Sequence, residues 1–219
     1  MMIQPITVLL LAVVSIVLLL VFAMCISVQV KETLKSCDQN NTCMIDKSTV
    51  PKYEPEKWNS DINIQSAHNC YAYALNDQQI GLRDRCKGLL AKGEESCVSL
   101  RPKPGVFAGH ENRDMTCGGL EKHILADNPY IKQGKRTDVC PPHHYKIAFA
   151  VKPGETYHFW RQDADGMWSH KDGGGPARDT DDSGKKITSP ETADRGKYHK
   201  FCKYLCVPKN YHYKTNMKP

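Results

Sequence analysis

The apolar residues divide the chain into one long apolar run and a polar remainder. Residues 6–30 form a run of 25 uncharged, mostly apolar positions. A bilayer core of about 30 Å requires roughly 20 helical residues, so this run predicts a transmembrane helix within residues 1–30. The alternative is a cleaved signal peptide with its cleavage site near residues 21–23. The run is longer than usual for a signal peptide, however, and no charged region precedes it.

Shorter patterns in the polar part predict a helix followed by strands. Apolar residues at i, i+3 and i+4 after the candidate N-cap Ser66 indicate the helix, and continuous or alternating apolar residues indicate the strands. The predicted elements are a helix at 66–77, a strand at 145–151, a β-hairpin at 156–171 and a closing strand at 198–207. Residues 78–144 are rich in Pro and Gly and are predicted to be irregular. This order of elements is typical of an α+β domain.

The same pattern divides the chain into four parts. We expect a transmembrane anchor at 1–30, a polar stalk at 31–57, a compact α+β domain at 58–208 and a basic tail at 209–219. The predicted fold class is therefore α+β, with an N-terminal single transmembrane helix followed by the compact domain.

The cysteine content and a glycosylation sequon indicate the compartment. Ten cysteines in 219 residues is high for a protein of the reducing cytosol. Asn40-Asn41-Thr42 is a sequon with Asn40 as the acceptor, although Lys31 and Lys35 weakly favour the opposite topology. We expect a single-pass membrane protein, in a host or virion membrane, with its C-terminal domain extracytosolic or lumenal. The lipid bilayer is then a partner of residues 6–30.

Cys70 is the first candidate for chemistry. It lies in the first turn of the predicted helix, where unpaired N–H groups and the helix dipole stabilise a thiolate. Apart from Cys25 in the apolar run, nine cysteines remain. Full pairing would therefore leave one thiol free, and Cys70 is the natural candidate. The alternative is that Cys70 is a buried small hydrophobe or one half of a disulfide.

Two histidines of the predicted hairpin are candidates for the base. Side chains alternate between the faces of a strand, and a three-residue hairpin loop would pair residues whose numbers sum to an even value. His158 and His170 then lie on one face, either opposite each other or one step apart. Two imidazoles in this arrangement suit a base and the group that orients it. The alternative is that each ring only packs beside a neighbouring tryptophan.

These residues resemble a known family. Asn69-Cys70 at the start of a helix, then His158 and His170 on successive strands, is similar to the NlpC/P60 branch of papain-like cysteine peptidases. The resemblance implies a papain-like domain with a short helix packed on an antiparallel sheet. It implies that Cys70 is the nucleophile, His158 the general base and His170 the residue that orients the base. Gln65 and Asn69 are then the oxyanion candidates.

The chain also departs from this family and resembles a second group. The peptidases usually have Asp-Cys-Ser, whereas this chain has Asn69-Cys70-Tyr71. Its Asn-Cys-Tyr and Tyr-His-Phe…Trp-Ser-His signatures resemble a group of bacterial and large-DNA-virus proteins, from which no function carries over.

Two functional hypotheses follow. The first is a membrane-anchored thiol hydrolase or transferase that acts on a peptide or amide-bearing substrate through the Cys-His-His set. The alternative is a catalytically inactive membrane or virion-envelope protein that binds a protein partner on the same scaffold.

No cofactor, metal or nucleic acid is expected. The net charge of +6 contains no run of four basic residues, and no nucleic-acid motif is present. A rival zinc site would use four residues, Cys140, His143, Cys202 and Cys206. It is less favoured than disulfides because two prolines separate the first pair and the second pair lies in a predicted strand.

Overall fold

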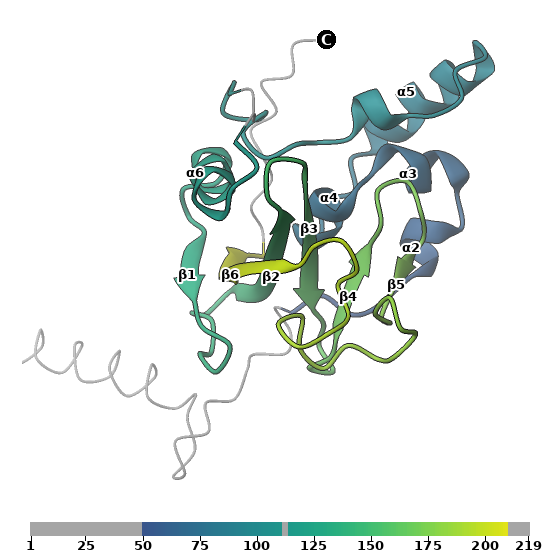
Figure 1. The fold of residues 1–219 in the computed structure, drawn as a ribbon. Helices are drawn as coiled ribbons and strands as arrows, with labels where there is room; N and C mark the ends of the chain where they lie inside the picture. Colours follow the sequence, from purple (N-terminus) through teal and green to yellow (C-terminus); the bar gives the residue numbers. More distant parts are fainter. Residues whose placement is uncertain (1–49, 111–113, 210–219) are drawn as a thin grey trace, which may run out of the picture. The chain divides into compact units, whose positions relative to one another are not determined.

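The chain folds around a single antiparallel sheet in a computed structural model that describes residues 50–110 and 114–209 (Figure 1). The six strands have the order β1-β6-β2-β3-β4-β5. They are β1 Lys132–Gly134, β2 His144–Lys152, β3 Thr156–Gln162, β4 Trp168–Lys171, β5 Ala177–Arg178 and β6 Lys200–Pro208. The helices are α2 Glu56–Asn59, α3 Ile62–Ala67, α4 Cys70–Ala74, α5 Ile80–Ala91, the 3-10 helix Val98–Leu100 and α6 Cys117–Asp127.

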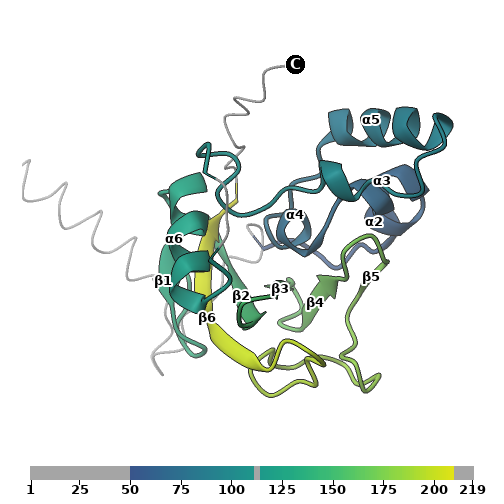
Figure 2. The same cartoon turned by 45° about the horizontal axis from the view of Figure 1, so that its top comes forward.

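Both faces of the central strands are buried, and each face has a different cover. On one face Phe149 of β2 and Phe159 of β3 pack with α4 and α6. On the other face Ala148 and Trp160 pack with Ile187 of the long connection between β5 and β6. Figure 2 shows the helices on one side of β3 and β4 and this connection on the other. A strand that is buried on both faces requires a nearly continuous apolar run, and residues 145–151 form such a run. β2 confirms the strand predicted there.

The predicted helix at 66–77 is in fact two helices. α3 and α4 are separated by two residues with extended backbone, the second of which is Asn69. Asn69, rather than Ser66, is the N-cap of α4, because its side-chain oxygen accepts a hydrogen bond from the N–H of Ala72 at 3.2 Å. Cys70 is therefore the first residue of α4, where backbone N–H groups have no intrahelical acceptor.

Every described cysteine except Cys70 is in a disulfide. The pairs are Cys86–Cys97, Cys117–Cys202 and Cys140–Cys206, and Cys70 is free and buried. The prediction of disulfides is confirmed for this part of the chain. The rival zinc site is wrong, because the pairing consumes three of its four proposed ligands.

One of these disulfides is attached at a β-bulge in β6. Phe149 of β2 pairs with Lys203, whereas the next residue, Ala150, pairs with Phe201. Cys202 is therefore the extra residue of the bulge, and it joins Cys117 at the start of α6. The disulfide at the bulge thus links β6 covalently to the helix that covers this face of the sheet.

The membrane part of the predicted fold class is corrected. In the two described stretches of chain, no helix has both the length and the apolar composition that crossing a bilayer requires. Residues 6–30, on which the anchor prediction depended, lie outside the described residues, as does Asn40. For residues 50–110 and 114–209 the fold class is therefore an antiparallel six-stranded sheet with short helices, none of which could span a membrane.

The described end of the predicted stalk is hydrogen-bonded to the domain. The carbonyl of Pro51 accepts a hydrogen bond from the N–H of Ala164 at 2.9 Å. The carbonyl of Lys52 accepts one from Nη2 of Arg161 at 3.1 Å. These contacts tie residues 51 and 52 to β3 and to the turn that follows it.

Asp181 holds the connection between β5 and β6 and provides a test of this region. Its carboxylate accepts hydrogen bonds from the N–H and hydroxyl of Ser183 and from the N–H groups of Lys185 and Asp194, at 2.8–3.1 Å. Burial acts to raise the pKa of Asp181, but these hydrogen bonds outweigh it and lower the pKa to about 2.

We expect Asp181→Asn to lower the free energy of unfolding by about 1–3 kcal/mol at pH 7. The pKa is lower in the folded state than the value of about 3.9 in the unfolded state, so the carboxylate stabilises the fold above about pH 4. This contribution is lost as the pH falls towards 2. Urea denaturation of both proteins at several pH values should show their difference shrinking in this window. A difference that stays constant with pH would contradict the prediction.

Candidate active site

Cys70 lies where the start of α4 meets β3. Its side chain is buried, with 4% exposed. Burial raises the pKa of the thiol to about 12, and the backbone N–H groups of Phe159 and Tyr71 act on the sulfur in the opposite direction. The thiol is therefore neutral at rest. Phe159 directly follows His158 in β3, so the sulfur is next to the backbone that carries this imidazole.

The two candidate histidines are in contact on the sheet face that the β5–β6 connection covers. Trp160 of β3 is opposite His170 of β4, which places His158 one step along the strand and diagonal to His170. Nε2 of His158 and Nδ1 of His170 are 2.7 Å apart. Nε2 of His170 is 2.9 Å from the carbonyl oxygen of Thr180. The structure thus brings together the two rings that the sequence placed on one face.

When both rings are neutral, these two hydrogen bonds fix the tautomer of each ring. A carbonyl oxygen only accepts, so Nε2 of His170 carries the hydrogen and its Nδ1 is an acceptor. Nε2 of His158 must then donate to that Nδ1. It follows that Nδ1 of His158 is unprotonated, which is the form that a general base requires.

The surroundings of His158 keep its ring neutral. The side chain is 1% exposed, stacks on Tyr198 at 4.8 Å between ring centroids and contacts Trp160 edge-on at 4.6 Å. Burial, followed by the neighbouring His170, lowers the pKa of His158 well below its usual value. Within residues 50–110 and 114–209 no hydrogen bond joins the thiol of Cys70 to either imidazole. The catalytic roles of these residues therefore stay a prediction.

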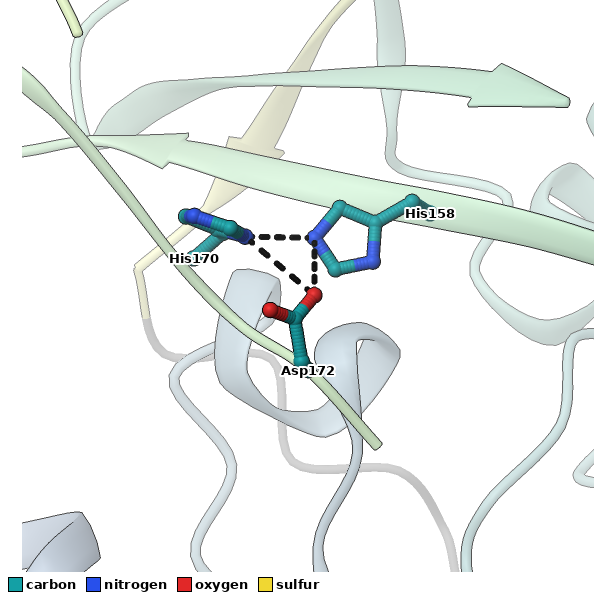
Figure 3. A group of neighbouring side chains, drawn as sticks. All are labelled: His158, His170 and Asp172. Atoms are coloured by element: carbon teal, nitrogen blue, oxygen red, sulfur yellow. Dashed lines mark hydrogen bonds and ion pairs between the residues drawn. The ribbon is translucent and has the colours of Figure 1, made fainter. Parts of the chain in front are cut away.

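Asp172 is a third member of the cluster, which the sequence pattern did not single out. Its Oδ1 is 3.5 Å from Nε2 of His158 and 3.6 Å from Nδ1 of His170 (Figure 3). Its Oδ2 accepts a hydrogen bond from Nη2 of Arg178 at 2.7 Å. Burial acts to raise the pKa of Asp172, but His170, His158 and Arg178 keep it well below its usual value. The alternation of β4, continued two residues past His170, is the signal that could have found it.

Lys171 fixes the backbone just before Cys70. The side chain is fully buried. Its three N–H donors are shared among four backbone carbonyl oxygens at 2.6–2.9 Å from Nζ, those of Gln65, His68, Gly173 and Gly175. Burial lowers the pKa of Lys171 to about 7, whereas four acceptors favour the charged form. The ammonium group therefore holds the segment between α3 and α4 against the loop after β4.

The two oxyanion candidates are already engaged in structural hydrogen bonds. The side-chain oxygen of Asn69 caps α4 and its Nδ2 donates to the carbonyl of Pro102 at 2.7 Å. Nε2 of Gln65 donates to the carbonyl of Gly174 at 3.3 Å. The N–H groups at the start of α4 have no intrahelical acceptor, which makes them additional candidates that sequence reasoning did not name.

Comparison with known proteins gives one informative match. The chain is 37% identical over 157 residues to insoluble matrix shell protein 1 of Ruditapes philippinarum, a match that covers 71% of this chain and 89% of that protein. No family model matches the chain, and no solved structure matches it.

This match also corrects the expected localisation. The sequence predicted a single-pass protein of a host or virion membrane, whereas the relative is named as a matrix protein of shell. None of the helices in the described part of the chain could span a membrane. The membrane, single-pass and viral assignments are therefore not carried forward.

Proposed function

We propose, from the premise that this chain belongs to the family of insoluble matrix shell protein 1, that it is a thiol hydrolase or transferase acting on amide bonds of matrix proteins. Cys70 is the nucleophile, His158 the general base and His170 the group that orients the base. The three disulfides suit such an oxidising extracellular setting. Cys70, the free thiol among the described cysteines, then serves through its reactivity rather than through pairing.

The observation that carries this proposal is the relay from Thr180 through His170 to His158. It leaves Nδ1 of His158 as a proton acceptor on the strand that contacts the Cys70 sulfur. A neutral thiol with a raised pKa is a weak nucleophile until a base removes its proton. The relay supplies such a base and fixes its orientation.

The reaction proceeds in two stages. Nδ1 of His158 takes the thiol proton while the sulfur attacks the amide carbonyl, and the protonated ring then gives this proton to the departing amine. The product is a thioester on Cys70. Water attacks the thioester in a hydrolase and a second amine attacks it in a transferase, and His158 again moves the proton.

Thiol labelling tests this function. We expect iodoacetamide to alkylate Cys70 of the native protein, and His158→Ala to slow the alkylation about 100-fold. His199→Ala, which removes an exposed histidine, is the matched control and should leave the rate unchanged. Mass spectrometry of the modified peptide measures each rate. Equal rates in wild type and His158→Ala would overturn the proposal.

A second candidate function is a matrix component that only binds its partners. The raised pKa of Cys70, about 12, favours it, since a thiol that stays neutral and buried behaves as a small hydrophobe. Under this alternative Cys70 resists alkylation in the folded protein and reacts only after denaturation. The labelling experiment therefore separates the two functions.

A further inference from the structure

The geometry points to a binding site for a divalent transition metal, with Zn²⁺ as the best fit, at His158, His170 and Asp172. One donor atom from each residue lies within 4.8 Å of the other two: Nε2 of His158, Nδ1 of His170 and Oδ1 of Asp172 (Figure 3). The site lies outside the cysteine pairs that were the rival zinc ligands. It uses Nε2 of His158, whereas the proposed general base is the other ring nitrogen, Nδ1.

The distances between the donors are close to those of a zinc site. Zn–N and Zn–O bonds of about 2.0–2.1 Å in tetrahedral geometry separate neighbouring donors by about 3.3 Å. Oδ1 of Asp172 is 3.5 and 3.6 Å from the two ring nitrogens. The two nitrogens are 2.7 Å apart because a hydrogen bond joins them. A metal ion that replaces this hydrogen needs only a small separation of the rings.

The outer contacts are also those of a metal site. Ligating histidines usually donate their second N–H to a carbonyl or carboxylate, which fixes the ring. His170 has this contact with the Thr180 carbonyl at 2.9 Å, and Arg178 holds the other oxygen of Asp172 at 2.7 Å. The side chain of Asp172 is 44% exposed, so the site opens to solvent on the side where a fourth ligand, water, would bind.

Metal binding changes the tautomer of His158 without changing its charge. Coordination through Nε2 requires that this nitrogen lose its hydrogen, and the neutral ring then carries its hydrogen on Nδ1. Asp172 supplies one negative charge to the ion, while the nearby cations Arg178 and Lys197 act against it. If His158 is the general base of the proposed function, its Nδ1 is no longer free. The metal then suppresses the thiol chemistry.

Spectroscopic titration tests the site independently of any activity. We expect Co²⁺ added to full-length protein carrying Cys70→Ser to bind one ion and to give the intense visible bands of tetrahedral coordination, and Zn²⁺ to displace it. His170→Ala and Asp172→Asn should each weaken binding at least about tenfold. His199→Ala, the matched control, should bind as the parent does. Circular dichroism confirms that each variant folds.

Two results would overturn the site: unchanged Co²⁺ affinity in His170→Ala and Asp172→Asn, or only the weak spectrum of the hexaaquo ion. A separate measurement addresses suppression. In the wild-type chain Zn²⁺ should slow the alkylation of Cys70 and EDTA should restore it. Metal binding without any alkylation of Cys70 would support the site and contradict the proposed function. Alkylation that is insensitive to bound Zn²⁺ would contradict the suppression alone.

Discussion

Replacing Cys117 and Cys202 together by alanine is expected to lower the free energy of unfolding by about 4–5 kcal/mol. The two residues are 85 positions apart. A disulfide that closes a loop of this length removes a large amount of conformational entropy from the unfolded chain. The same bond ties α6 to β6, so its removal also frees the helix that covers one face of the sheet.

The other disulfides provide an internal scale for this prediction. Cys86 and Cys97 are 11 positions apart, and their joint replacement should cost about 3 kcal/mol. Urea denaturation of the two double variants measures both losses. A loss for the Cys86/Cys97 variant as large as that for the Cys117/Cys202 variant would show that loop length does not determine the stabilisation here.

Lys171→Met is expected to destabilise the protein by about 3–5 kcal/mol. Methionine fills a similar volume but leaves four buried or half-buried carbonyl oxygens without their donor. Part of the loss is recovered, because burying the ammonium group is itself costly, as its lowered pKa of about 7 shows. Thermal and urea denaturation measure the net effect.

The matched control is Lys185→Met, which changes an exposed lysine and should alter stability by no more than about 0.5 kcal/mol. Because Lys171 holds the segment that precedes Cys70, the alkylation rate of Cys70 should also change in Lys171→Met under conditions where the protein remains folded. A variant as stable as the control would contradict the importance of these four hydrogen bonds.

The sheet was largely predictable, whereas most of the helices were not. The apolar run at 145–151 and the alternation at 156–171 carry the strand period directly. α5 and α6 lie in the region predicted to be irregular, and both contain glycines that weaken the helical signal. Each of these helices is also tied by a disulfide. That constraint depends on tertiary structure and leaves no periodic pattern in the sequence.

The candidate site was also predictable in part, because two of its residues lie on strands with a clear alternating pattern. The alternation of β3 and β4, together with a hairpin loop of odd length, places His158 and His170 on one face. The loop at 163–167 is longer than the three residues expected, but an odd length preserves this parity. Asp172 and Lys171 escaped notice because their roles depend on the register of the hairpin and on where β4 ends. The sequence did not predict that the helix is interrupted at Asn69. An N-cap residue within an apolar segment is also compatible with a continuous helix, and tertiary packing decides between the two.

Both long-range disulfides end on β6, and this has a consequence for biosynthesis. Chains emerge from the ribosome N-terminus first, so Cys117 and Cys140 appear 85 and 66 residues before their partners. Until β6 is made, Cys117 and Cys140 lack their native partners while the thiol of Cys70 is also free. Any disulfide among these three residues is non-native. A nascent chain truncated before residue 202 can form only the Cys86–Cys97 bond among the native pairs of the described residues. Formation of the two long-range disulfides therefore has to wait until β6 has been synthesised.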